Sequence, residues 1–378
     1  GRFSGSGVSY RNPAVEVRNA GLSGNLDVSE SGVRVDDLSV SSSAGKFRGT
    51  LDLKDWRDLR LRGDVSSLSL QAAAAAVRQQ GLPWSANLRG PVQLSATVGR
   101  AGISDLAAAG HLDVLPSGGG VPASGALDWK YSQKPERIEI GKSEFTVGSS
   151  RIQVSGALGS RLQVDVVSHN LNDVVPALRL AGLTQPEPLP VSLKEGTVHV
   201  TASVVGNLRD PGVEGHLEAT NVVFRDHKID RISSDFEVNR LLLRLEKTEV
   251  AQGPAAASGR ARAALMNWKI EPSSVIEAAI KVRNADVAAL LAQAGSKLPV
   301  SGVADADLQV ANTFGDPQVR GSLRAVHGKA WDQPFDLAKS DVQLDGPVLH
   351  LAGASITAGK ANGGGSITYR RVGEEWGS

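Results

Sequence analysis

Apolar and polar residues alternate along most of the chain. In residues 197–205 the apolar side chains at 198, 200, 202 and 204 point one way, and the polar side chains between them point the other. The same alternation occurs at 92–98, 161–166 and 304–310. A period of two is typical of strands with one apolar and one solvated face, so the chain is predicted to be mainly β and antiparallel. Pairs such as Asp316-Pro317 and Gly346-Pro347 are expected to form the turns.

Three segments depart from this alternation and are predicted to be short helices. They span residues 69–80, 172–181 and 284–294, and each is followed by a glycine. Asn172 and Asn284 stand where a helix-capping residue is expected, and a glycine directly after a helix is a common stop. A proline-containing linker follows each of the three segments.

The strand pattern repeats with a period of about 105 residues. Gly110-His111-Leu112, Gly215-His216-Leu217 and Gly321-Ser322-Leu323 lie 105 and 106 residues apart, and the last two copies keep an offset of 106 over a long run. A slip of one residue would invert every strand face, so this constancy predicts a repeated unit of many strands and one helix. We expect repeats at 1–114, 115–217 and 218–323 and a partial repeat at 324–378, joined in one continuous sheet.

The apolar positions are mostly Val, Leu, Ala and Ile, which are too small to fill the centre of a barrel or sandwich. The pattern therefore predicts an elongated, curled antiparallel sheet whose apolar face lines a groove, with the helices lying across the groove or along its rim. A groove wider than its own side chains can fill leaves apolar surface that needs an occupant. The residues predicted to line it are Val92, Leu94, Ala96, Val98, Val198, Val200, Ala202, Val204, Leu308 and Val310.

Composition narrows the possible functions. The chain has 41 Lys and Arg against 40 Asp and Glu, a net charge of +1, which argues against nucleic acid as a partner. It has no cysteine, so disulfides, thiolate metal sites and a cysteine nucleophile are excluded. The seven histidines lack metal-binding spacing, and Asp305 and Asp307 would share the solvated face of a strand. We expect no catalytic residues, no metal and no cofactor, and hence a protein that is not an enzyme.

A phrase of the form G-x-L-x-D-P-x-V-x-G-x-L runs from Gly206 to Leu217, followed by Lys228–Asp235, and a variant of it runs from Gly315 to Leu323. In these residues the chain resembles the periplasmic β-rich region of the AsmA-like superfamily, most closely the TamB type. The resemblance implies a protein of the periplasm of a Gram-negative-type bacterium, anchored in the full-length form to the inner membrane by a segment before Gly1. It also implies phospholipid acyl chains as cargo and partner proteins in the inner and outer membranes.

Three functions remain open on the sequence. The first is a lipid conduit, in which the groove shields acyl chains that would cost about 0.8 kcal/mol per methylene to expose to water. The second is a scaffold or chaperone for outer-membrane protein assembly, in which a free sheet edge pairs with a client strand by β-augmentation. The third is a structural repeat protein with a filled core. These hypotheses predict an open apolar groove, a regular exposed edge strand and no void, respectively.

Overall fold

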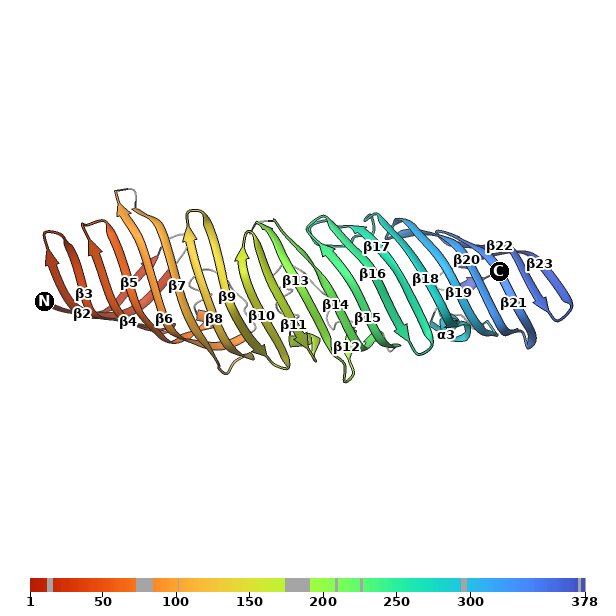
Figure 1. The fold of residues 1–378 in the computed structure, drawn as a ribbon, viewed down its shortest axis with the longest axis horizontal. Helices are drawn as coiled ribbons and strands as arrows, with labels where there is room; N and C mark the ends of the chain where they lie inside the picture. The colour runs from red at the N-terminus through yellow and green to blue at the C-terminus, as the bar shows by residue number, and fades with distance from the viewer. Residues whose placement is uncertain are drawn as a thin grey trace. The chain divides into compact units, whose positions relative to one another are not determined.

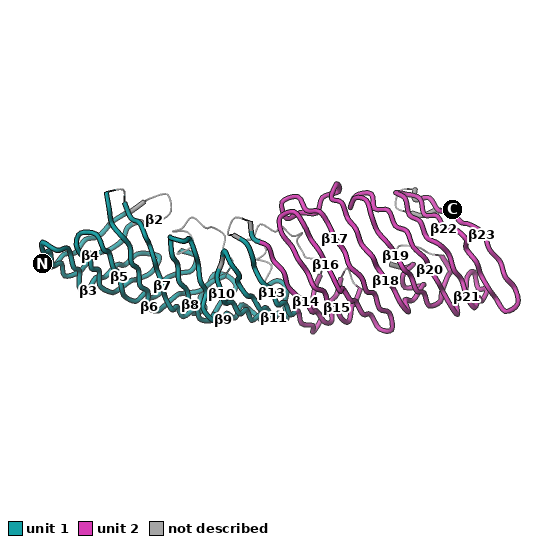
Figure 2. Tube along the Cα trace, turned by 45° about the horizontal axis from the view of Figure 1, so that its top comes forward, with its two compact units in different colours: residues 1–186, 199–211 teal, residues 187–198, 212–378 magenta. Residues whose placement is uncertain are grey.

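The structure is a computed structural model that describes residues 1–11, 16–72, 84–100, 102–173, 191–207, 210–224, 227–293, 298–372 and 375–377. Strands make up 81% of it and helices 4%, which confirms the prediction of a mainly β, antiparallel protein. The chain divides into two compact units (Figure 2), the first of residues 1–186 and 199–211 and the second of residues 187–198 and 212–378. The predicted division into repeats ending at residues 114, 217 and 323 remains a prediction.

The first unit is a sheet in which consecutive strands pair antiparallel from β1 to β11 (Figure 1). Its strands are β1 (Arg2–Arg11), β2 (Glu16–Ser29), β3 (Gly32–Ser42), β4 (Gly45–Lys54), β5 (Asp58–Ser69), β6 (Trp84–Gly99), β7 (Gly102–Pro116), β8 (Val121–Gln133), β9 (Glu136–Val147), β10 (Ser150–Leu158), β11 (Arg161–Ser168) and β13 (Val198–Asn207). A 3₁₀ turn, Leu171–Asp173, follows β11.

The second unit repeats this construction from β14 to β24. Its elements are β12 (Val191–Leu193), β14 (Asp210–Phe224), β15 (His227–Val238), β16 (Leu242–Gln252), β17 (Ala255–Ala264), β18 (Ile276–Asp286), α3 (Val287–Gln293), β19 (Val300–Thr313), β20 (Asp316–Ala330), β21 (Gln333–Asp345), β22 (Val348–Ala358), β23 (Ala361–Val372) and β24 (Glu375–Gly377). The sheet is curled and does not close into a barrel, as predicted.

Bulges interrupt the strand pairing at several places in both units. The register shifts around Asp37, Ser67, Lys247, Asn284 and His327, and each of these residues has a positive φ. An extra residue in the left-handed region bends the strand and increases its twist, so these bulges help to curl each sheet. Asn, Asp and His adopt this conformation more readily than most residues, whereas at Ser67 and Lys247 it is strained.

The packed core of the first unit is small and lies at one end of its strands. Beyond the end of β7, the first residues of β6 and β8 pair directly, with Trp84 opposite Val121 and Ser85 opposite Pro122. The sheet therefore folds onto itself here. The side chains buried at this end, which we call the end core, are Ala86, Leu88, Leu112, Val114, Ala123 and Val147.

The helix predicted at 284–294 begins later than expected. The strand β18 continues through Asp286, and α3 starts at Val287. Asn284 has a φ of 54° at a bulge, which explains why an asparagine stands there without capping a helix. The cap is Asp286 instead, whose Oδ1 accepts a hydrogen bond of 3.0 Å from the N–H of Ala289.

The other two predicted helices are only partly described. Ser69 caps the first, accepting a 3.3 Å hydrogen bond from the N–H of Ala72, but residues 73–83 lie outside the described residues. The second falls on the 3₁₀ turn and on residues 174–190, which are also outside them. The turn prediction was wrong for Asp316-Pro317, which opens β20 after a turn at residues 314 and 315. It was right for Gly346-Pro347, which forms the turn between β21 and β22. Proline is tolerated at the first residues of a strand because few ladder bonds are lost there.

Candidate functional site

A continuous line of apolar side chains crosses the first unit at right angles to its strands. Residues paired directly across neighbouring strands share a face of the sheet. The strand pairing therefore places one apolar residue from each of eight strands in a line, which we call the first apolar row. From β2 to β9 its members are Leu26, Val35, Leu51, Leu61, Leu94, Ala108, Tyr131 and Ile138. At about 4.8 Å between strands, the row is about 34 Å long.

The second unit contains an equivalent line over nine strands, which we call the second apolar row. From β15 to β23 its members are Phe236, Leu245, Ala261, Ala278, Val310, Val319, Leu344, Leu349 and Tyr369. No charged or amide side chain interrupts either row, and the only hydroxyl groups in the rows are those of Tyr131 and Tyr369. The strand spacing gives the second row a length of about 38 Å.

These side chains are half-buried, not packed inside a core. Every member of both rows has intermediate exposure, except Val35, which is 7% exposed. The rows are therefore partly open apolar surface, of the kind that binds an apolar partner.

The structure places most of the predicted lining residues on such faces. On β6, Ala96 is 7% exposed and Val92, Leu94 and Val98 are half-buried. Leu94 belongs to the first row and Val310 to the second. Leu308 lies two residues from Val310, and Ile280 and Gly321 are its cross-strand partners.

The alternation is less clear on β13. Ala202 is 9% exposed, and Val198, Val200 and Val204 are half-buried, but Ser203 on the opposite face is also buried, at 8%. The Ser203 hydroxyl donates to Gln163 Oε1 at 3.2 Å and accepts from the guanidinium of Arg161 at 3.4 Å. These hydrogen bonds to β11 bury Ser203, whereas Thr201 on the same face stays exposed. A role of these residues in lining a lipid path remains a prediction.

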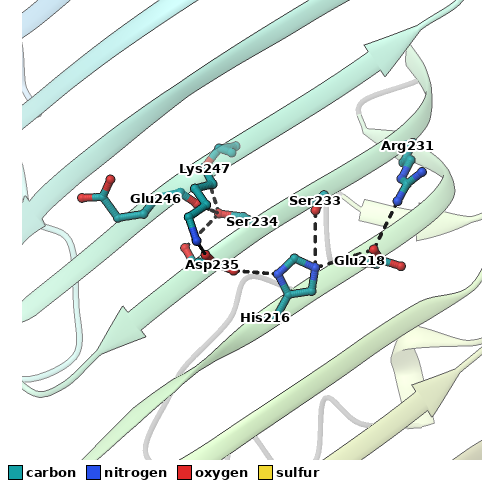
Figure 3. Close-up of polar contacts among 9 residues, drawn as sticks. His216, Glu218, Arg231, Ser233, Ser234, Asp235, Glu246 and Lys247 are labelled. Atoms are coloured by element: carbon teal, nitrogen blue, oxygen red, sulfur yellow. Dashed lines mark hydrogen bonds and ion pairs between the residues drawn. The ribbon is translucent and has the colours of Figure 1, made fainter.

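The opposite face of each sheet carries networks of charged side chains. In Figure 3, His216 on β14 lies between two carboxylates: its Nδ1 is 2.7 Å from Asp235 Oδ1, and its Nε2 is 3.6 Å from Glu218 Oε1. Lys247 Nζ is 2.9 Å from Asp235 Oδ2, and Arg231 binds Glu218 at 3.2 Å. All five side chains are more than a third exposed, so the network is a solvated surface feature.

The nearest charged partner determines the direction in which the pKa of each of these side chains shifts. The hydrogen bond from Lys247, followed by that from His216, holds the pKa of Asp235 below its usual range. The same contact raises the pKa of Lys247. In the first unit, His111 Nδ1 lies 2.6 Å from Asp128 Oδ1, and this hydrogen bond raises the pKa of His111. The repeat period of the sequence places His111 and His216 at equivalent positions, but their aspartate partners lie on the neighbouring strand and have no signal in the sequence.

Several contacts of the second unit recur after 106 residues. The N–H of Gly253 donates to Asp230 Oδ2 at 2.6 Å, and the N–H of Gly359 donates to Asp336 Oδ2 at 2.7 Å. The Ser234 hydroxyl donates to two carbonyl oxygens at a bulge, and Ser340 does the same at the corresponding bulge. The constant offset seen in the sequence thus corresponds to repeated local structure within this unit.

The described residues contain no group of three or more His, Asp or Glu side chains placed to hold a metal ion. Asp305 and Asp307 instead pair with arginines, Asp305 with Arg324 at 3.6 Å and Asp307 with Arg283 at 2.9 Å. No helix in the described part of the chain is long and apolar enough to cross a membrane.

Comparisons with known proteins found no relative. No protein-family model, no curated protein and no solved structure matches the chain. The features that indicate a function are therefore the two apolar rows and the polar face opposite them.

Proposed function

We propose that this chain is a non-catalytic segment of an envelope-spanning protein whose apolar face conducts phospholipid between the inner and outer membranes of a Gram-negative-type bacterium. The observation that carries the proposal is the pair of uninterrupted, half-exposed apolar rows. The resemblance of Gly206–Leu217 and Gly315–Leu323 to the AsmA-like superfamily supports the periplasmic location and the choice of cargo.

The length of the rows suits acyl chains. The hydrocarbon core of a bilayer is about 30 Å thick, so one acyl chain spans about 15 Å, and each row is at least twice that length. A phospholipid with about 30 methylenes would expose them to water at a cost of more than about 20 kcal/mol. A continuous apolar line replaces that single barrier with many small steps of nearly equal free energy.

The absence of charged and amide side chains within either row also favours transport over storage. A strong polar contact would hold a head group at one place and slow its release, whereas a uniform surface lets the cargo move. Polar head groups would remain in water beside the sheet, so no specific head-group pocket is required for passage.

The test compares neighbouring residues on opposite faces of β21. Leu344 belongs to the second apolar row, and Gln343 next to it is exposed on the polar face. Leu344→Asp should reduce the phospholipid that binds to the purified chain about tenfold or more, because losing contact with about two methylenes costs about 1.6 kcal/mol. Gln343→Asp adds the same charge on the polar face, where residue 343 lies opposite Arg320, so it should leave binding through the acyl chains unchanged when excess orthophosphate is present.

Bound phospholipid is measured by mass spectrometry of lipid extracted from the purified chain and by titration with a fluorescent acyl-labelled phospholipid. Circular dichroism melts show whether both variants remain folded. The proposal fails if the unsubstituted chain binds no phospholipid or if both variants lose it equally. Capture of an unfolded outer-membrane β-barrel protein without any lipid would instead favour the β-augmentation scaffold.

A further inference from the structure

The polar face of each unit contains a depression bordered by positive side chains. In the first unit a depression of about 630 Å³ lies over β5 to β9. Four of its lining residues are cations, Arg60, Arg62, Lys130 and Arg137, and only Glu139 is an anion. Arg137 binds Glu139 at 3.0 Å, which neutralises that pair. Of the other three cations, Arg60 lies opposite Asp52, and Lys130 shares its opposite residue Glu139 with Arg137. No carboxylate lies opposite Arg62, so Arg62 and Lys130 supply the excess positive charge.

These three cations have no partner in the described part of the chain. No hydrogen bond or ion pair joins Arg60, Arg62 or Lys130 to another described residue. Other side chains engage Asp113, Asp128 and Glu139 nearby, whereas no described side chain engages Asp52 or Asp64. Surface cations usually lie near carboxylates in this protein, as in the networks of His111 and His216. A cluster of unpaired cations around a hollow indicates an anionic ligand.

The shape of the depression follows from one cross-strand line. Arg62 on β5, Gln93 on β6, Ala109 on β7 and Lys130 on β8 are paired in that order. The two cations are three strand spacings apart, about 14 Å, and the residues between them are short or uncharged. The long side chains of Arg62 and Lys130 can therefore approach one ligand from both sides, above a floor formed by Ala109 and beside the Gln93 amide.

The second unit contains the same arrangement in a different part of the chain. Arg260 on β17, Ala279 on β18, Gln309 on β19 and Arg320 on β20 are paired in that order and line a depression of about 770 Å³. Two cations again enclose one alanine and one glutamine. Neither arginine has a partner among the described residues.

Other charges around this second depression are largely balanced. Lys247 binds Asp235, and Arg283 binds Asp307. Lys281 lies directly opposite Asp307, and Glu246 is the second carboxylate at the rim. The two unpaired arginines therefore provide the excess positive charge.

We propose that each unit binds a phosphate group in this depression, held by the two flanking cations and the glutamine amide. Donors that approach from three sides suit a tetrahedral oxyanion, and the planar fork of arginine binds phosphate in a bidentate manner. The phosphate could be free or belong to a lipid head group at a membrane surface. This inference does not depend on the proposed function, because these residues lie on the face opposite the apolar rows.

The experiment measures how many phosphate ions bind to each chain by equilibrium dialysis against labelled orthophosphate at constant ionic strength. The purified chain should bind two, with dissociation constants on the order of 1 mM for such exposed sites. The double variant Arg62→Gln/Lys130→Gln should bind one, and so should Arg260→Gln/Arg320→Gln. In each variant the altered site should weaken at least tenfold.

A matched control removes the same charge elsewhere. Lys54 and Lys360 are exposed and line neither depression, so Lys54→Gln/Lys360→Gln should still bind two ions. Exposed substitutions of this kind usually change the free energy of unfolding by less than about 0.5 kcal/mol, so all variants should fold. Equal weakening in the control would show general attraction by surface charge and would overturn the proposal.

A second arm identifies the source of the phosphate. Sedimentation with vesicles of phosphatidylglycerol and phosphatidylcholine in equal amounts, against phosphatidylcholine alone, tests for a lipid head group. Loss of vesicle binding in the two double variants, with the control unaffected, would support the site and assign it to a membrane surface. Absence of selective binding in both arms would refute the proposal.

Discussion

Leu94 and Leu112 provide a direct test of whether the apolar face is open or packed. Both lie in the first unit, on the neighbouring strands β6 and β7. Leu94 is a half-buried member of the first apolar row, and Leu112 is 6% exposed in the end core. The two variants Leu94→Ala and Leu112→Ala remove the same atoms from these two environments.

The expected destabilisations differ because only one site is enclosed. At Leu112 the lost transfer free energy is joined by the cost of a cavity, so Leu112→Ala should lower the free energy of unfolding by about 3 kcal/mol. At Leu94 the three carbons lost are worth about 2.4 kcal/mol if fully buried, and about half of that when half-buried. No closed cavity remains, so we expect about 1 kcal/mol for Leu94→Ala.

Urea unfolding of the full chain, followed by tryptophan fluorescence and by circular dichroism, measures both changes. The two sites belong to one unit, so any separate transition of the second unit affects both variants in the same way. If Leu94→Ala costs as much as Leu112→Ala, the row is packed shut and the conduit proposal loses its basis. If a phospholipid stabilises the original chain and Leu112→Ala but stabilises Leu94→Ala less, the row is the binding surface.

Three further predictions follow from single contacts. Gly148→Ala should lower the free energy of unfolding by about 2 kcal/mol or more in urea melts, because residue 148 has a φ of 57° and a Cβ there would lie 2.5 Å from Asp173 Oδ1. The pKa of His111 is raised, so its contact with Asp128 stabilises the fold below about pH 6.5. This stabilisation is lost as the pH rises through the pKa of the folded state. Asp128→Asn should bring the pKa of His111 back towards about 6.5 in an NMR titration. Asp286→Ala should cost about 1 kcal/mol and speed amide exchange in α3, whereas an unchanged rate would mean that the cap does not hold the helix.

Much of the fold follows from the alternation of residues. A period of two is sufficient to predict strands with one apolar face, and the small side chains on that face predict a sheet that does not close around a core. Both features appear in the apolar rows. The offset of 106 residues was also visible in the sequence, and it corresponds to repeated hydrogen bonds such as those of Asp230 and Asp336.

Other features depend on which strands pair and on the register of that pairing. Neither can be predicted from a single sequence. Asn284 is of the residue type expected at a helix cap, but a bulge places it in the left-handed region within β18. Asp316-Pro317 is a pair that is common in turns, yet the turn is formed by residues 314 and 315, and the pair begins β20. The polar-face depressions cannot be predicted from the sequence either. Arg62 and Lys130 are distant in sequence, and only the pairing of β5 to β8 places them on either side of one depression.

The charged face also explains how strands with such similar apolar faces find one register. A slip of two residues keeps every apolar side chain on its face, so a row of Leu and Val distinguishes poorly between the two registers. Opposite charges across the strands do distinguish them. Arg34 lies opposite both Asp27 and Asp52, and Asp52 lies opposite Arg60, so charge alternates from β2 to β5. A slip of two between β4 and β5 would bring Lys54 opposite Arg60 and place like charges together, which is unfavourable. Each exposed pair adds little stability, but a line of them selects one register, and that register keeps the apolar row continuous.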